Sequence, residues 1–236
     1  MSLLQVKDLS ISFGGVKAVD GVSFTVEPGE VFTLVGPNGA GKSTIFNLIS
    51  RLYEPGGGQI LFDGQDITSL PAHKVAGLGI ARTFQNIELF DHSSVLQNLL
   101  IGRHCRRNTR WFEELLFLPK VRRSERQHRL LVEEVIDFLD LAAYRDKLIA
   151  GLPYGVRKVV EIARALSSEP KLILLDEPAS GLSVEETQNM AWGIEDMQKD
   201  LGLTVLMVEH DMSLVSRVSN RVLAVSEGRP LAMGTA

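Results

Sequence analysis

Residues 36–44 read Gly36-Pro37-Asn38-Gly39-Ala40-Gly41-Lys42-Ser43-Thr44, which fits the phosphate-loop pattern G-x-x-x-x-G-K-[ST] at every fixed position. The apolar run 31–35 predicts a buried strand before the loop, and residues 45–50 predict the first turns of a helix after it. Glycines let such a loop wrap around a β-phosphate, toward which the helix N-terminus directs amide hydrogens and partial positive charge. We expect Lys42 to neutralise β- and γ-phosphate oxygens and Ser43 to ligate Mg²⁺. The alternative is a glycine-rich turn that binds nothing; the lysine, the hydroxyl and the strand together argue against it.

A second stretch predicts what happens to the nucleotide. Residues 171–178 read Lys-Leu-Ile-Leu-Leu-Asp-Glu-Pro, an apolar run that ends in two acids. This pattern predicts a buried parallel strand that delivers Asp176 and Glu177 to the carboxyl edge of a sheet, where ligands of open α/β sheets bind. We expect Asp176 to hold Mg²⁺ through a water and Glu177 to take a proton from the attacking water. An acidic pair alone more often caps a helix, but here a phosphate loop precedes it.

A third motif follows the apolar run 204–208, which ends at Glu209-His210-Asp211. A histidine at the end of a core strand is, by itself, more often structural than catalytic. The order of motifs along the chain is more informative than the histidine alone. A phosphate loop is followed by Gln85, a glycine-containing segment before a helix, Leu-Leu-Asp-Glu-Pro and then a strand-terminal histidine. In this order the chain resembles the ATPase subunits of ABC transporters, and the resemblance covers essentially the whole sequence.

The resemblance implies roles for single residues. Phe13 matches the aromatic residue that stacks on adenine, and residues 36–44 match the Walker A loop that binds ATP. Gln85 matches the glutamine that touches Mg²⁺ and the attacking water and senses the membrane subunit. Asp176 and Glu177 match the Walker B aspartate and the catalytic glutamate, and His210 matches the histidine that contacts the γ-phosphate. For Phe13 the alternative is core packing on a strand, and for Gln85 it is a solvated loop amide.

Two motifs depart from the family pattern. The signature loop, usually Leu-Ser-Gly-Gly-Gln, is Leu-Pro-Tyr-Gly-Val at residues 152–156, so Pro153 offers neither a hydroxyl nor an amide hydrogen. Gly155 still permits close backbone approach to a nucleotide, and a helix expected at 157–166 still directs its dipole there. The second departure is Ser183, which ends the D-loop Ser-Gly-Leu-Ser where an aspartate is common. The resemblance therefore implies a heterodimer with a second ABC ATPase that keeps the serine, with a homodimer as the alternative.

Composition indicates the size of the core and the cellular compartment. The chain has 236 residues, 44% of them hydrophobic, which is enough for one sizeable core. Its 25 basic and 29 acidic residues give no nucleic-acid footprint, and the single cysteine, Cys105, suits a reducing cytoplasm. No apolar run approaches the roughly 18 residues of a membrane helix, and the N-terminus lacks the regions of a signal peptide. Any membrane role is therefore expected to depend on a partner.

The predicted fold is an α/β P-loop NTPase core of the ABC ATPase type, with an antiparallel β subdomain and an inserted α-helical subdomain. Residues 1–236 form one ABC ATPase domain, in which about 1–85 and 154–236 make the core with its β subdomain. Residues of about 86–153 make the helical subdomain, which ends at the signature loop. Helices are expected at 95–101 and 125–141. In the second helix the predicted core residues are Leu130, Leu131, Val135, Phe138 and Leu139.

Basic residues gather between Arg103 and Arg129, interrupted by Trp111-Phe112 and by the apolar run 115–118. An ordinary solvated helical face is the simpler interpretation of this cluster; contact with anionic lipid heads or with an acidic partner is the alternative. The charged members are Arg106, Arg107, Arg110, Lys120, Arg122, Arg123 and Arg126, against Glu113, Glu114 and Glu125.

The resemblance can be narrowed to one kind of transporter. Residues 81–90, 95–100 and 208–212, together with the Tyr154-Gly155 signature, look like the ATPase subunits of bacterial branched-chain amino acid importers. This implies permease subunits as partners, a periplasmic solute-binding protein as an indirect one, and a position on the cytoplasmic face of the cell membrane. Related importers of urea or short amides share these features. Similar chains continue past Gly234-Thr235 with another helix, whereas this sequence stops at Ala236.

Two other classes of function agree less well with the sequence. Soluble ABC proteins that act on ribosomes usually carry two cassettes in one chain, and those that act on DNA carry a long coiled-coil insertion; neither feature is present. A regulatory module that binds nucleotide without turning it over would not need Lys42, Asp176, Glu177 and His210 together. The sequence therefore favours an ATPase that couples hydrolysis to solute import.

Overall fold

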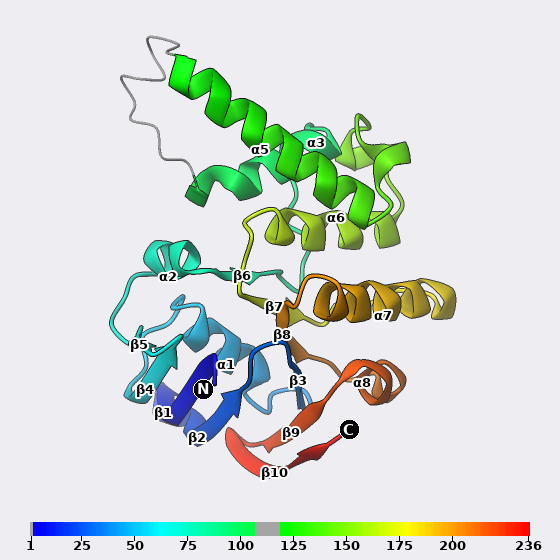
Figure 1. Ribbon diagram of the computed structural model, residues 1–236. Helices are drawn as coiled ribbons and strands as arrows, with labels where there is room; N and C mark the ends of the chain where they lie inside the picture. Colours follow the sequence, from blue (N-terminus) through cyan, green and yellow to red (C-terminus); the bar gives the residue numbers. More distant parts are fainter. Residues whose placement is uncertain (1, 107–118) are drawn as a thin grey trace. The chain divides into compact units, whose positions relative to one another are not determined.

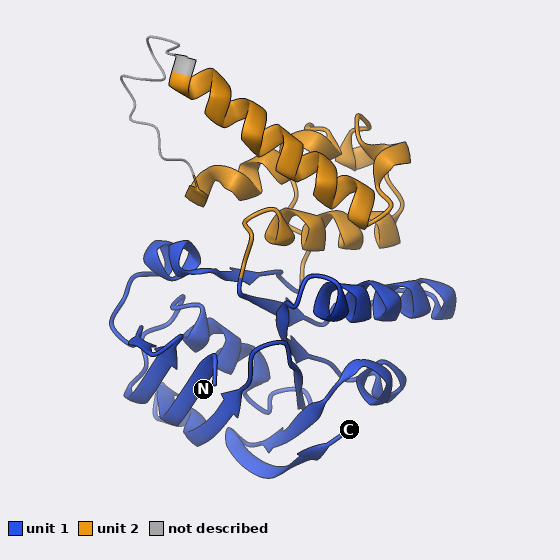
Figure 2. Cartoon of the chain, viewed as in Figure 1, with its two compact units in different colours: residues 1–85, 171–236 blue, residues 86–170 orange. Residues whose placement is uncertain are grey.

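The computed structural model describes residues 2–106 and 119–236, and these form two compact units. One unit contains residues 1–85 and 171–236, and the other contains residues 86–170 (Figure 2). The helical segment expected at 86–153 lies within the second unit, which continues through the next helix to Pro170. We describe each unit by itself.

The first unit contains an antiparallel sheet of four strands in the order β2-β1-β4-β5. Residues Gly14 and Gly15 connect β1 to β2 with positive φ angles of 53° and 86°, which glycine adopts without strain. The turns at residues 14–15 and 63–64 thus join β1 to β2 and β4 to β5 as antiparallel hairpins. The strands are β1 (Leu4–Phe13), β2 (Val16–Val26), β4 (Gly57–Phe62) and β5 (Gln65–Asp66).

The second sheet of this unit has six strands in the order β10-β9-β3-β8-β7-β6 (Figure 1). Neighbouring strands run parallel from β9 to β6, and only β10 is antiparallel to its neighbour. The adjacent strands β8 and β7 are buried at every residue, as continuous apolar runs in a parallel sheet should be. The strands are β3 (Val31–Val35), β6 (Ile80–Arg82), β7 (Leu172–Asp176), β8 (Thr204–Val208), β9 (Arg221–Ser226) and β10 (Arg229–Thr235).

Helix α1 (Lys42–Ile49), which follows the phosphate loop, lies inside the core of this unit. Its residues Ile45, Phe46, Leu48 and Ile49 are fully buried and join one apolar cluster with residues of both sheets. A helix that is apolar on several faces must be covered on all of them. The core therefore fixes the helix that carries Lys42 and Ser43. Three further helices complete the unit, namely α2 (Ala72–Leu78), α7 (Val184–Lys199) and α8 (Met212–Val218).

The second unit is built from helices around its own apolar cluster, to which Leu99, Val132, Ile136 and Val160 contribute. The elements among its described residues are α3 (Val95–Gly102), η1 (Arg103–Arg106), α5 (Pro119–Phe138), η2 (Ala142–Tyr144), η3 (Ile149–Gly151) and α6 (Tyr154–Leu166). None of the helices within residues 2–106 and 119–236 is both long and apolar enough to cross a bilayer.

The predicted apolar face of α5 is wrong at Leu130, and the expected core residues Leu131 and Phe138 are only half-buried. Leu130, expected in the core, is 56% exposed, whereas Val132 and Ile136 are fully or almost fully buried. Both patterns have helical spacing, and only the packing of α3 and α6 decides which face of α5 turns inward. The expected core residues Val135 and Leu139 pack at the margin of the cluster.

The basic cluster of the sequence is described only in part, because Arg107, Arg110, Trp111-Phe112, Glu113, Glu114 and the run 115–118 lie outside the described residues. Lys120, Arg122, Arg123 and Arg126 are exposed on α5, as a solvated helical face would be. Arg106 instead donates hydrogen bonds to the carbonyls of Ser168 and Glu169, just beyond the C-terminus of α6. Cys105 is an exposed free thiol.

Ser183, where the family pattern has an aspartate, is the N-cap of α7. Its hydroxyl accepts a hydrogen bond from the Glu186 amide, and the Glu186 carboxylate accepts one from the Ser183 amide, which completes a capping box. The serine therefore serves the same end of the helix that an aspartate would serve.

We predict that Ser183→Ala lowers the free energy of unfolding by about 1 kcal/mol, because it removes the acceptor of this capping box. Ser183→Asp is the matched control and should stay within about 0.5 kcal/mol of the wild type, since aspartate caps helices equally well. Urea denaturation followed by circular dichroism measures both variants. Equal stability of the alanine and aspartate variants would contradict the capping role.

Candidate nucleotide-binding site

The phosphate loop joins β3 to α1 and follows a path that only glycine permits. At Gly36 a Cβ atom would lie 2.1 Å from the Val225 carbonyl oxygen, and at Gly41 it would lie 2.5 Å from that of Ala18. Both glycines have positive φ angles, of 154° and 97°. Backbone hydrogen bonds hold the neighbouring turn in place, because the Gly228 amide donates to the Ala40 carbonyl at 3.0 Å. Close backbone contacts thus fix the path of the loop at both of these glycines.

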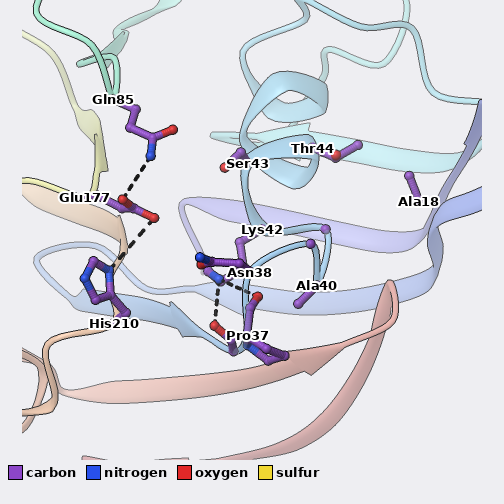
Figure 3. Close-up of a pocket in the computed structure, with 13 residues that line it drawn as sticks. Ala18, Pro37, Asn38, Ala40, Lys42, Ser43, Thr44, Gln85, Glu177 and His210 are labelled. Atoms are coloured by element: carbon purple, nitrogen blue, oxygen red, sulfur yellow. Dashed lines mark hydrogen bonds and ion pairs between the residues drawn. The ribbon is translucent and has the colours of Figure 1, made fainter. Parts of the chain in front are cut away.

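Lys42 begins α1 and points back into the loop. Its side chain is largely buried, and the ammonium Nζ donates hydrogen bonds to the carbonyls of Gly36 at 2.7 Å and Pro37 at 2.9 Å (Figure 3). Ser43 and Thr44 follow at the first turn of the helix. A cation, a hydroxyl and the free amides of a helix N-terminus therefore converge on one side of the loop, as phosphate binding requires.

The acidic pair occupies the carboxyl end of β7, as the sequence predicts. Asp176 is buried, and its Oδ2 atom accepts a hydrogen bond from Nη2 of Arg82 at 3.0 Å. Glu177 follows with φ of 49°, a left-handed conformation that costs a non-glycine residue about 1–2 kcal/mol. Its amide donates to the Val208 carbonyl at 3.0 Å, which ties this turn to the neighbouring strand.

Glu177 lies between the two other residues expected in the site. Gln85 Nε2 donates to Glu177 Oε2 at 3.1 Å, and His210 Nδ1 lies 3.9 Å from Glu177 Oε1 (Figure 3). The glutamate side chain is only 14% exposed, whereas that of His210 is 58% exposed. The structure thus brings together three residues from the loops that follow β6, β7 and β8, with the carboxylate in the middle.

A cavity of about 500 Å³ opens beside the loop, within the usual size range of small-molecule sites. Its lining joins the phosphate loop to the residues around Glu177, so that one space contains most of the predicted site. The lining residues are Ala18, all of residues 36–44, Gln85, Glu177 and His210.

Two predicted nucleotide contacts lie elsewhere. Phe13 is 46% exposed at the end of β1 and contacts Tyr53 edge to face, with ring centroids 5.4 Å apart, so it is not a core residue. It is not among the residues that line the cavity. Gly155 belongs to the other unit, where it is buried in the first turn of α6. That helix begins at Tyr154, three residues before the expected start, because Pro153 serves as its N-cap without a side-chain hydrogen bond.

The residues present fit Mg²⁺ bound together with a nucleotide. Among the described residues, no group of three or more His, Cys, Asp or Glu side chains could hold a metal ion by itself. Mg²⁺ commonly uses one or two protein oxygens plus substrate phosphates and waters, so it needs no such group. Ser43, Gln85 and Asp176 offer oxygen donors of this kind.

Sequence reasoning missed two residues that organise the site. The first is Arg82, whose guanidinium also donates to Asn47 Oδ1 at 2.7 Å and to Ser50 Oγ at 2.9 Å. The second is Glu209, which is fully buried. Its Oε1 atom accepts from the Ala179 amide at 2.9 Å, and Oε2 accepts from the amides of His210 and Asp211 at 2.8 and 3.1 Å. For Glu209 the available signal was an acidic residue directly after the apolar run 204–208, whereas Arg82 follows no such run because β6 is only three residues long.

Glu209 therefore joins the turn after Glu177 to the turn that presents His210. The next residue, Asp211, is the N-cap of α8 and accepts from the Ser213 hydroxyl at 2.6 Å and from the Ser213 amide at 2.8 Å. These two hydrogen bonds hold the pKa of Asp211 below its ordinary value. The backbone around His210 is thus fixed on both sides, although its imidazole is solvent-accessible.

The fold and this site define a P-loop nucleoside triphosphatase. Residues 19–180 match the family described as ABC transporter. The high-affinity branched-chain amino acid transport ATP-binding protein BraF of Pseudomonas aeruginosa is 40% identical over 233 residues, which cover 99% of this chain and 91% of BraF. The protein of that description named LivG in Escherichia coli K12 is 38% identical over the same shares of the two chains. The ADP conformation of the ATP-binding cassette MJ1267 has a TM-score of 0.87 and 31% identity, and covers 100% of this chain and 92% of MJ1267.

The chain belongs to the ABC transporter family, and within it to the ATP-binding subunits that hydrolyse ATP for transport. The family and the fold class predicted from the order of motifs are thereby confirmed. The roles of the single site residues remain predictions.

We predict that Glu209→Gln lowers the free energy of unfolding by about 1–3 kcal/mol, because the amide turns one acceptor into a donor that faces backbone N–H groups. Glu185→Gln, an exposed change in the first turn of α7, is the control and should stay within about 0.5 kcal/mol. Thermal and urea unfolding of both variants measure the difference. If the two variants are equally stable, Glu209 does not anchor these turns.

Proposed function

We propose that this protein is the ATP-hydrolysing subunit of an importer of branched-chain amino acids. The observation that carries the proposal is the shared cavity, in which the phosphate loop faces Glu177 with Gln85 and His210 on either side. The choice of solute rests on BraF and LivG, branched-chain amino acid transport proteins that match this chain over almost its full length.

In this proposal the phosphate loop binds ATP. The amides at the start of α1 and the Lys42 ammonium would bind the β- and γ-phosphates, and Lys42 would exchange its hydrogen bonds with the Gly36 and Pro37 carbonyls for phosphate oxygens. Ser43, Gln85 and Asp176 would hold Mg²⁺. When bound, the ion neutralises charge on the phosphates during phosphoryl transfer. Phe13 and Tyr53 offer an exposed aromatic pair for the adenine ring.

In this proposal Glu177 is the general base for ATP hydrolysis. Its side chain is nearly buried, and Gln85 and His210 restrict its orientation, so the carboxylate is held in place to accept a proton from water. His210 is exposed enough to reach a γ-phosphate from the opposite side of the carboxylate. Gln85 is the last residue of the first unit before the helical unit begins, a position suited to sensing a permease subunit.

For partners, we propose permease subunits, a second ABC ATPase and, indirectly, a periplasmic solute-binding protein. This arrangement would hold the chain at the cytoplasmic face of the cell membrane. Pro153 supplies no hydroxyl and no amide hydrogen at the signature loop. A different ATPase that keeps a serine there would complete the ATP site at Lys42 and Glu177. The proposed assembly is therefore an asymmetric heterodimer on two permease subunits.

We predict that Glu177→Gln retains ATP binding but lowers hydrolysis by about 10²- to 10⁴-fold, the usual contribution of a positioned base. Lys42→Ala should instead weaken ATP binding itself. The measurements are ATPase rates of the transporter reconstituted with its permeases, and equilibrium binding of a fluorescent ATP analogue. Arg229→Gln, at the exposed start of β10, is the control and should leave both quantities unchanged.

Near wild-type hydrolysis by Glu177→Gln would remove Glu177 as the base, and unchanged ATP affinity of Lys42→Ala would remove the phosphate-loop assignment. The corresponding glutamate change in the partner ATPase tests asymmetry, because it should reduce turnover less. Uptake of radiolabelled leucine, isoleucine and valine, compared with urea and short amides, tests the solute. ATP-dependent uptake of urea alone would contradict the branched-chain assignment.

A further inference from the structure

Arg82 occupies a central position in the first unit that no catalytic motif of the sequence accounts for. Its side chain retains 9% of its accessible surface, and its guanidinium forms an ion pair with Asp176 at 3.0 Å. The same guanidinium lies 5.7 Å from the ring centroid of Phe46 and 5.1 Å from that of Phe84, so it packs against two aromatic rings.

The contacts of Arg82 connect three elements of the site. Nη2 donates to Asp176 at the end of β7, and Nη1 donates to Asn47 and Ser50 in and just after the last turn of α1. Arg82 itself ends β6, three residues before Gln85. One rigid side chain therefore links the helix that carries Ser43 to the strand that carries Asp176.

We propose that Arg82 is a positioning residue for Mg²⁺: it fixes the Asp176 carboxylate relative to α1, so that the oxygen donors of both elements meet the ion together. This inference rests on the proposed function, because it concerns the same nucleotide site. Mg²⁺ demands near-ideal octahedral geometry, and its affinity therefore depends on where its ligands are held. Groups that hydrogen-bond to a metal ligand and orient it typically contribute 10- to 100-fold to metal affinity.

The chemistry of arginine suits this task better than that of lysine. A planar guanidinium directs several N–H groups in a fixed fork, which lets it bond to Asp176, Asn47 and Ser50 at once while it stacks on aromatic rings. A lysine ammonium would keep the positive charge beside Asp176 but not this geometry. Charge and positioning are therefore separable by substitution.

The experiment measures ATP binding with and without Mg²⁺ in the full chain, with Glu177→Gln as the common background so that ATP is not consumed. A fluorescent ATP analogue is bound first in excess EDTA, and the Mg²⁺ concentration that gives half of the additional binding is then determined. We expect Arg82→Gln to raise this Mg²⁺ concentration by about 10- to 100-fold. Metal-free ATP affinity should change by less than about threefold, because Arg82 is not among the residues that line the cavity.

Arg51→Gln is the matched control. Arg51 is also buried, but it donates to the carbonyls of Leu70 and Tyr53, so its loss should lower stability without changing the Mg²⁺ requirement. Arg82→Lys should give an intermediate Mg²⁺ requirement, and it decides the question if Arg82→Gln does not fold. In an Asp176→Asn background, Arg82→Gln should have no further effect on Mg²⁺.

An unchanged or lower Mg²⁺ requirement in a folded Arg82 variant would overturn the inference, and so would an equal shift in Arg51→Gln. A lower requirement would show that Arg82 acts as a repelling charge instead. Failure of the proposed function would give a different result. The Glu177→Gln protein without any change at Arg82 would then bind no ATP, either in EDTA or with Mg²⁺.

Discussion

The site depends on the close backbone contacts of the phosphate loop. Gly36 and Gly41 lie against the carbonyls of Val225 and Ala18 at separations that exclude any side chain, and Gly228 adds hydrogen bonds to Ala40 and Asp20. Strands from both sheets thus hold the loop from outside, while α1 holds it from within the core. A loop held in this way keeps its amides directed at a phosphate before any ligand arrives, which reduces the entropy lost on binding.

The catalytic side of the site is organised by buried charges. Arg82 and Glu209 are hydrogen-bonded to the residues that flank Glu177: one through the Asp176 carboxylate, the other through the amides of Ala179 and His210. Both are charges largely removed from water, which is tolerated because both carboxylate oxygens of Glu209 and both terminal nitrogens of Arg82 have hydrogen-bond partners, although Arg82 Nε has none. The exposed residues Gln85 and His210 can then respond to nucleotide or partner while the carboxylates between them stay in place.

Much of this architecture could be predicted from the sequence. The strand at Val31–Val35, the phosphate loop and the acidic end of β7 follow local patterns, so the structure places them where the sequence predicts. The inward face of α5 was predicted with an error at Leu130, because helical spacing does not show which face meets α3 and α6. The Arg82–Asp176 pair could not be predicted, since it depends on the parallel register of β6 and β7 rather than on any motif.

The most direct measurement of the central claim is ATP affinity after Gly41→Ala, by equilibrium titration with a fluorescent ATP analogue. The added methyl would meet the Ala18 carbonyl at 2.5 Å, so the loop must change its path. Gly77→Ala in the exposed part of α2, where a Cβ meets nothing within 4 Å, is the control. The account predicts that Gly41→Ala loses at least about tenfold in ATP affinity, a free-energy change of about 1.4 kcal/mol, while Gly77→Ala binds as the wild type does. Equal ATP affinity of a folded Gly41→Ala variant would contradict it.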